Sequence, residues 1–368
     1  MLSAEAYLEL LIRQHENAVP LLPGTTGPND GQRSHIRALQ TGNTGIYAAA
    51  AKEENELIAS LNLPENASAA DVVRIYLRDQ LHKPLIDSLD AQERVRLEVV
   101  PVGLLTLRML NARAFKSPNG DPVIVMNQGL LNLLSEYKEM QMEAAFLSDQ
   151  EGREFAEKYE RSCYRFLLKQ FDSISPFDNN SMLATPAELL EVKARVRMPE
   201  HAMWANQMTY MGAEMFVLAH EFAHVAAGHL DTADTRSVGP DGGSPSSTST
   251  TLSCYKLSWQ QEYEADRLGY LHFLKAWPVS STREISPIEI IAPLTFFELL
   301  HLVECNLPRP DAYGTHPPAW RRAVALLQVT KREYRLLAPE NANLRALCAS
   351  FRRHLLAIQQ LEIWRDND

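Results

Sequence analysis

The chain has 368 residues, which fits one large domain or two medium ones, and its composition of 45% hydrophobic and 22% charged residues is that of an ordinary globular protein. Its formal net charge is −10, and its basic residues are scattered instead of forming a stripe. We therefore expect no nucleic-acid partner, because nucleic-acid binders usually carry a basic face.

The cysteines are far apart and include no CxxC pair: Cys163, Cys254, Cys305 and Cys348. This excludes a dense disulfide framework, so we expect four free thiols in a reducing compartment. Met1–Ile12 lacks the basic segment of a secretory signal, and glutamates interrupt its apolar run. The most apolar stretch, 288–303, contains glutamates, a proline and a histidine. It is also shorter than a membrane-spanning helix, which needs about 20 apolar residues. We predict a cytoplasmic protein with no membrane span.

The first 95 residues are expected to form a helical region of unknown role. Met1–Asn17 carries apolar residues at helical spacing, and Ser68–Leu81 opens with a residue that can cap a helix. Pro20–Ser34 is rich in Gly, Pro and Asn, which favours an irregular connection. These helices either pack on the rest of the chain or form a separate recognition module.

Near residue 95 the pattern changes towards β-structure. Arg96–Leu107 and Pro122–Met126 are rich in β-branched and apolar residues, which is typical of strands. Lys116–Asp121 is a strong turn signal, because Pro, Asn and Gly adopt turn backbone angles at little cost. The region predicts a small sheet with a hairpin, followed by a helix over Gln128–Tyr137.

The remaining chain is predicted to be mostly helical. Tyr210–His229 is a long apolar helix, and Tyr255–Trp277 is another helix. Between them, Thr232–Ser253 is rich in Gly, Ser and Thr, so it buries too little apolar surface to offset its ordering entropy. We expect residues 232–253 to form a mobile loop, which is either a lid or a passive tether.

The motif His220-Glu221-Phe222-Ala223-His224 is an HExxH sequence within the apolar helix. Residues four apart on a helix lie one above the other, so His220 and His224 can reach one metal ion. Glu221 would then face a water molecule. A buried helix could instead carry two core histidines, but histidines and a glutamate in so apolar a helix would be costly without partners.

A second motif, Glu262-Tyr263-Glu264-Ala265-Asp266, places Glu262 and Asp266 four apart on the next predicted helix. A zinc site with two histidines needs a third protein ligand, which Glu262 would supply. Asp266 would accept a hydrogen bond from the ring N–H of a ligand histidine and so fix its tautomer. Read alone, the motif would indicate only an acidic amphipathic helix.

Together these motifs resemble the gluzincin metallopeptidases, and most of all the M48 peptidases. Two further stretches support the resemblance: Asn111–Phe115 with Pro122–Leu131 is similar to the family's edge strand and following helix, and Thr315–Pro318 with Arg322 is similar to its His-Pro motif and later arginine. The resemblance covers residues 96–330. Unlike the membrane-embedded members, this chain has no predicted transmembrane helix and carries a long helical insertion before the HExxH motif.

The resemblance implies a zinc-dependent endopeptidase whose substrate is a protein or peptide. Zn²⁺ would be held by His220, His224 and Glu262, with Glu221 as general base. His316 or Arg322 would stabilise the developing oxyanion. An edge strand near Pro122–Met126 would align an extended peptide. The alternatives are a zinc peptidase that acts as a regulatory switch on one protein, such as a repressor or translation factor, and a catalytically silent zincin-like binding protein.

Several other polar residues are given simpler interpretations. His229 lies about 140° round the helix from His224, so we expect it to end the helix and not to bind the metal. Glu264 is expected to point to solvent, and His272 and His301 to be core or groove residues. The fold class is predicted as α+β: a mostly helical, zincin-like catalytic domain over 96–368 with one small sheet beside the active-site helix.

Overall fold

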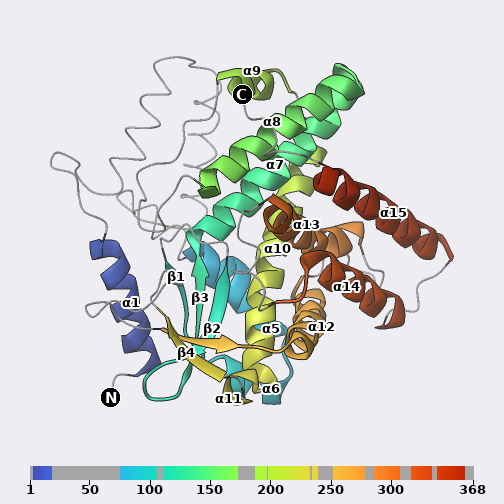
Figure 1. Cartoon of the computed structure of the whole chain (residues 1–368). Helices are drawn as coiled ribbons and strands as arrows, with labels where there is room; N and C mark the ends of the chain where they lie inside the picture. Colours follow the sequence, from blue (N-terminus) through green and yellow to red (C-terminus); the bar gives the residue numbers. More distant parts are fainter. Residues whose placement is uncertain are drawn as a thin grey trace.

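The computed structural model describes residues 3–18, 75–105, 111–172, 187–196, 198–232, 234–238, 252–277, 286–306, 316–333 and 338–360 (Figure 1). Its helices are α1 (Ala4–Ala18), the π-helical η1 (Leu77–His82), α5 (Lys83–Ser88), α6 (Ala91–Leu97), α7 (Gln128–Gln150), α8 (Arg153–Asp172), α9 (Ala187–Arg195), α10 (Glu200–Ala226), α11 (His229–Thr232), α12 (Trp259–Ala276), α13 (Pro287–Asn306), α14 (Ala319–Glu333) and α15 (Ala338–Gln360). Its strands are β1 (Val102–Leu105), β2 (Ala112–Lys116), β3 (Pro122–Asn127), β4 (Asp234–Val238) and β5 (Leu252–Lys256). The predicted α+β class, mostly helical with a small sheet, is confirmed.

The larger sheet has the strand order β1-β3-β2. β2 and β3 form the predicted hairpin around the 116–121 turn, where Gly120 takes the positive φ of 94° that glycine tolerates best. β1 pairs with β3 in parallel on the other side. The prediction of an edge strand at Pro122–Met126 is therefore wrong: β3 is central. Its nearly continuous buried apolar run is typical of a strand covered on both faces.

Successive side chains of the strands point to opposite faces of the larger sheet, and each face packs against a different part of the core. Val123 and Val125 of β3 pack with α1, together with Leu11 of that helix. Ile124 and Met126 point to the other face and join the main core, which includes α10. Because successive strand residues point to opposite faces, one short strand separates α1 from the helix that carries the HExxH motif.

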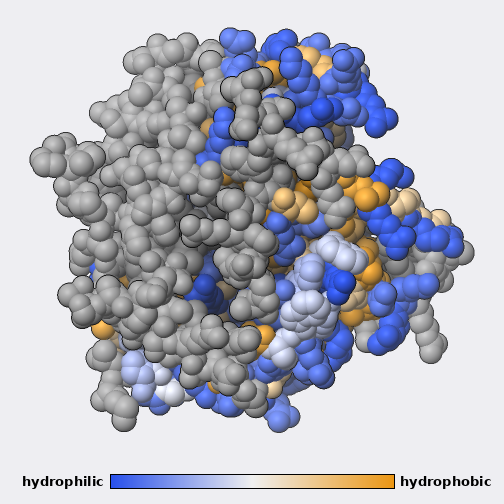
Figure 2. Space-filling model, in the orientation of Figure 1, coloured by the Kyte–Doolittle hydropathy of each residue, from blue (hydrophilic) through white to orange (hydrophobic). Residues whose placement is uncertain are grey.

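Helix α10 is the central element of the helical body, with α7, α12 and α13 packed against it (Figure 1). Its second half is buried almost all round, from Gly212 to His224. A helix that is apolar on every face is stable only inside a core. The polar residues of the HExxH motif are therefore held in the interior, as the sequence indicated. In Figure 2 hydrophilic side chains dominate the described surface around α7 and α8, at the top of the view.

The described helices before residue 95 pack on this body. η1 and α5 contact α10 and α12, and their Leu81 and Leu85 are fully buried in the main core. The Tyr76 hydroxyl donates a 2.5 Å hydrogen bond to the buried Glu214 carboxylate of α10. Residues of η1 and α5 are therefore part of the main core. The predicted connection Pro20–Ser34 and residues 68–74 of the predicted helix lie outside the described residues.

The predicted loop at 232–253 is partly wrong, because its two ends form strands. β4 and β5 pair antiparallel from Asp234↔Lys256 to Val238↔Leu252 as a second, two-stranded sheet. Ladder hydrogen bonds between these ends supply the stabilisation that the apolar content of the segment does not. β5 also contacts β2. Residues 239–251, between the two strands, lie outside the described part of the chain.

No helix in the described residues is both long and apolar enough to cross a membrane. The predicted buried helix at 288–303 lies within α13, which is packed between α10 and α14 and accommodates Pro293. Cys163 is a buried free thiol and Cys305 an exposed one. The side chains of the other two cysteines lie outside the described residues.

Candidate metal centre

His220 and His224 lie one turn apart on the same face of α10. Their rings meet edge to face with centroids 4.6 Å apart, and their Nε2 atoms are 3.0 Å apart. Both side chains are buried. The intervening Phe222 and Ala223 point into the core, as helical periodicity requires.

Helix α12 brings Glu262 to the two histidines. The helix begins with a capping box, in which the Ser258 hydroxyl accepts from the Gln261 N–H and the Gln261 side chain accepts from the Ser258 N–H. Glu262 follows immediately and is completely buried. One turn after Asp266 the helix meets α10 at Gly269, where the two backbones are in contact.

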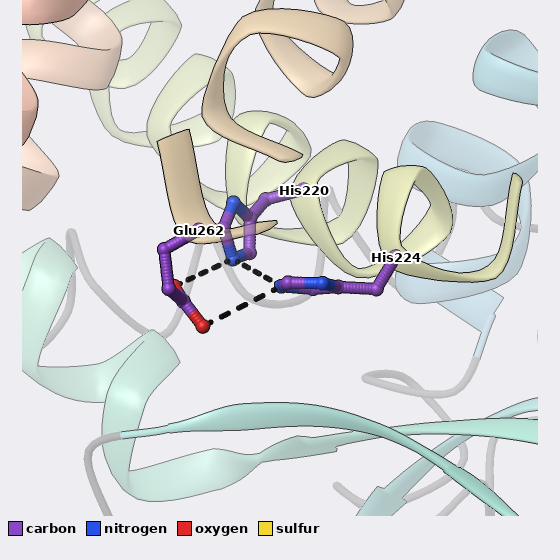
Figure 3. A group of neighbouring side chains, drawn as sticks. All are labelled: His220, His224 and Glu262. Carbon is purple, nitrogen blue, oxygen red and sulfur yellow. Dashed lines mark hydrogen bonds and ion pairs between the residues drawn. The ribbon is translucent and has the colours of Figure 1, made fainter. Parts of the chain in front are cut away.

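The three side chains form a compact group (Figure 3). Glu262 Oε2 lies 3.6 Å from His220 Nε2, and Glu262 Oε1 lies 3.8 Å from His224 Nε2. An ion with four tetrahedral bonds of about 2.0–2.2 Å would hold neighbouring ligand atoms roughly 3.3–3.6 Å apart. The observed separations are close to that range, so the group is compatible with one bound metal ion.

The hydrogen bonding of Glu262 supports the same interpretation. Neither carboxylate oxygen receives a hydrogen bond of good geometry from a described residue, although both are buried. A buried ionised oxygen without a well-aligned hydrogen bond is costly, and metal coordination is one way of removing that cost.

The buried carboxylates at the site outnumber the buried guanidinium groups, which is compatible with a bound cation. Three carboxylates lie at the site, those of Glu221, Glu262 and Asp266, against the single guanidinium of Arg322. With all three carboxylates ionised and both histidines neutral, these groups would carry two excess negative charges. A doubly charged cation would balance them, which matters because uncompensated charge in a protein interior is strongly destabilising.

Asp266 connects α12, α10 and α14 behind the three candidate ligands. Its carboxylate accepts two hydrogen bonds from Arg322, from Nε at 2.8 Å and from Nη2 at 2.7 Å. His220 Nδ1 also faces Asp266 Oδ1 at 3.0 Å, although this contact lacks the angle of a good hydrogen bond. The structure thus places Asp266 beside a candidate ligand histidine, with an arginine partner that the motif did not indicate.

Arg322 itself is buried, and its guanidinium stacks over the Phe297 ring at 5.2 Å. Its Nη2 lies 3.4 Å from Glu262 Oε2 and 3.5 Å from His220 Nε2. His316, on the segment before α14, places Nδ1 3.0 Å from Glu262 Oε1, and its side chain is half exposed. Both residues predicted to assist the chemistry are therefore brought to the group.

Glu221 points from α10 towards the hairpin. Its Oε2 accepts a 2.6 Å hydrogen bond from the backbone N–H of Ala114 in β2. β2 is hydrogen-bonded to β3 on one side, so this N–H belongs to its outer edge. Burial raises the pKa of Glu221, and the negative charge of Glu262 raises it further, which favours a carboxylate that accepts a proton readily.

The pKa values of the two histidines are shifted in opposite directions. Burial lowers the pKa of His224 well below its ordinary value, and the adjacent His220 adds to the effect. Burial also lowers the pKa of His220, but Asp266 outweighs burial and raises it. For Glu262, burial raises the pKa, yet Arg322 and His316 outweigh it and hold the carboxyl ionised. A neutral His224 and an ionised Glu262 are in the protonation states that metal binding requires.

Other contacts of the site were missed by the sequence analysis. His229 was expected only to end the helix, but its Nδ1 lies 2.9 Å from His224 Nδ1. Glu264 was expected to point to solvent, and while half exposed it also lies 3.4 Å from His229 Nε2. The Gly228-His229 pair was the available signal, because a glycine with positive φ turns the chain back towards its helix. His272 and His301 are buried, as expected of core residues.

Comparisons of this chain with protein-family models, with curated proteins and with solved structures find no match.

Proposed function

We propose that the protein is a zinc-dependent endopeptidase of the gluzincin type, which hydrolyses peptide bonds in a protein substrate. The observation that carries the proposal is the buried His220, His224 and Glu262 group with Glu221 next to it. Two histidines and one carboxylate are the ligand set of many catalytic zinc sites, which leave one position for water or substrate. Structural zinc sites instead tend to use four protein ligands, often with cysteine.

Zinc bound at this site would supply Lewis acidity, which lowers the pKa of water and polarises a peptide carbonyl. Glu221 is the general base: it removes a proton from the attacking water and returns it to the leaving amine. The Ala114 N–H holds the Glu221 carboxylate in one orientation. The half-exposed His316, rather than the Arg322 guanidinium that binds Asp266 in a bidentate manner, is the better-placed donor for the developing oxyanion.

The substrate is proposed to be an extended peptide lying along the outer edge of β2. An edge strand offers N–H and C=O groups for β-augmentation, and Ala114 places this edge directly beside Glu221. A peptide on β2 would run past the general base, which explains how a small sheet could orient a scissile bond in this helical protein.

Glu221→Gln tests the proposed function. The substitution keeps the shape of the side chain and removes its basicity, so zinc content and fold should be unchanged while cleavage of an unfolded protein such as casein falls by at least about 100-fold. Glu214→Gln is the matched control, because Glu214 is also a buried carboxyl group on α10 but lies outside the HExxH motif and hydrogen-bonds Tyr76. This control should cleave at nearly the wild-type rate.

Cleavage should also cease on removal of zinc with a chelator and return when zinc is added back. If Glu221→Gln cleaves casein and a mixed peptide library as fast as Glu214→Gln does, the proposed mechanism is wrong.

A further inference from the structure

His229 lies directly behind His224, on the side away from the other two candidate ligands. Chain reversal at Gly228, with φ 70°, brings the start of α11 back against α10. The two Nδ1 atoms are 2.9 Å apart, and the ring of His229 is buried. Its Nε2 atom faces Glu264 Oε2 at 3.4 Å. A chain of contacts thus runs from His224 through His229 to Glu264.

The donors and acceptors along this series of contacts can be assigned from hydrogen-bond chemistry. His224 turns Nε2 towards His220 and Glu262, so binding a cation there uses the Nε2 lone pair and leaves the proton on Nδ1. The Nδ1 of His229 must then accept that proton's hydrogen bond. His229 consequently carries its own proton on Nε2, which points to the Glu264 carboxylate. Glu264 favours one tautomer of His229, which favours one tautomer of His224.

We propose that His229 and Glu264 are positioning residues that fix the tautomer and ring orientation of His224 for zinc binding; this inference rests on the proposed function of the site. They do for His224 what Asp266 does for His220. Such partners keep the ligand nitrogen aimed at the metal, and their loss typically weakens metal affinity by about 10- to 100-fold.

Helix α12 then supplies three carboxylates with different tasks. Glu262 would contact the metal, Asp266 orients His220, and Glu264 acts on His224 through His229. The spacing explains the arrangement: residues 262 and 266 lie on one face of the helix, while 264 lies on the opposite side. From there its half-exposed side chain reaches the start of α11 instead of the metal group.

The test measures zinc affinity of the full-length protein by chelator competition. His229→Phe keeps a ring of similar size but removes both nitrogens, whereas His229→Asn keeps an oxygen acceptor close to the position of Nδ1. His272→Phe is the control, because His272 is a buried histidine whose Nε2 also faces a carboxylate, that of Glu93 at 3.2 Å. Thermal unfolding of the zinc-free proteins shows whether each variant folds.

The expected result is a zinc affinity about 10- to 100-fold weaker in His229→Phe, with His229→Asn and His272→Phe within about 3-fold of wild type. Affinity unchanged in His229→Phe overturns the inference while leaving zinc binding intact. Equal losses in His229→Asn and His229→Phe also overturn it, because the acceptor would then be irrelevant. If His229→Phe does not fold, Glu264→Ala replaces it in the test. We expect its zinc affinity to be about 3-fold or more weaker than that of the wild type. An unchanged zinc affinity in Glu264→Ala would overturn the inference. Absence of zinc binding by the wild type would overturn both the proposed function and this inference.

Discussion

Gly269 of α12 lies directly against the backbone of His220 in α10. A Cβ atom at position 269 would stand 2.8 Å from both the Cα and the N of His220, closer than real Cβ contacts come. Only glycine permits this approach, so the spacing between α10 and α12 is set directly beside His220, one of the three candidate ligands. The separation of His220 from Glu262 depends on it.

Gly269→Ala is therefore expected to be harmful, although alanine is favoured over glycine in a helix by about 1 kcal/mol. The two helices must separate to admit the methyl group, and such overpacking typically costs about 1–3 kcal/mol. We expect lower stability in urea unfolding together with weaker zinc binding. Gly212→Ala is the control, since its Cβ would stand 2.8 Å from Ala292 Cβ and not beside a ligand. Gly212→Ala should be less stable than wild type but should bind zinc with the same affinity. If Gly269→Ala also binds zinc as tightly as wild type, the spacing between α10 and α12 is not critical for the metal site.

Ala114→Pro tests the hydrogen bond to Glu221, the proposed general base. Proline removes the N–H that Glu221 accepts, and edge strands tolerate proline where the N–H points away from the sheet. We expect a stably folded protein with normal zinc content and a casein cleavage rate reduced by about 10-fold or more, because Glu221 loses its orientation. Ala112→Pro, two residues along the same strand, controls for the effect of proline on the hairpin. Equal activity in the two variants would show that this hydrogen bond does not matter for the reaction.

A second ionic group, made by residues outside the candidate metal group, predicts how the stability of the fold depends on pH. His354 of α15 lies between Glu298, with Nδ1 to Oε1 at 3.2 Å, and Glu160, with Nε2 to Oε1 at 3.4 Å. Burial alone would lower the pKa of His354, but the two carboxylates outweigh it and raise the pKa to about 10. The charged imidazolium therefore fastens the last described helix to α8 and α13.

The sign of the effect follows from the raised pKa. An unfolded histidine has a pKa of about 6.5, so the stabilisation is complete below that pH and is lost as the pH rises towards about 10. His354→Gln should be less stable than wild type by roughly 1.5–3 kcal/mol at pH 6, as for other hydrogen bonds to charged groups. The difference in unfolding free energy between His354→Gln and wild type, measured by urea unfolding, should decrease steadily as the pH rises to about 10. Arg353→Gln, exposed on the same helix, should show no such trend. A difference that grows with pH would contradict the assignment.

The parts of the fold that the sequence predicted well are those with a strong local signal. Tyr210–His229 was recognised as a helix from its apolar content, and α10 includes it as far as Ala226 but begins earlier, at Glu200. The 116–121 turn identified the hairpin. Strand order carries no comparable signal, because β1 pairs with β3 across 22 residues from Val102 to Ile124. A central strand was consequently mistaken for an edge strand.

In the candidate site, too, the features with a local sequence signal were predicted and the contacts between distant segments were not. Spacings of four residues indicated that His220 with His224, and Glu262 with Asp266, share helix faces. The contacts that connect separate elements left no periodic pattern: Ala114 reaches Glu221 from 107 residues away, and Arg322 reaches Asp266 from 56. His229 was judged by its angle around a continuing helix, but the helix ends before it and the chain turns back. Similarly, the ends of the Gly- and Ser-rich segment form strands because each supplies the other's hydrogen-bond partners.

The zinc content of the purified protein tests the central claim most directly. Inductively coupled plasma mass spectrometry should find about one zinc ion per wild-type chain. Glu262→Gln and His224→Ala should retain little of it, because each removes one of the three ligands, while Glu221→Gln should retain all of it. Wild-type protein that contains no zinc, and takes up none when zinc is supplied, would contradict the account. Full zinc retention in both ligand variants would contradict it equally.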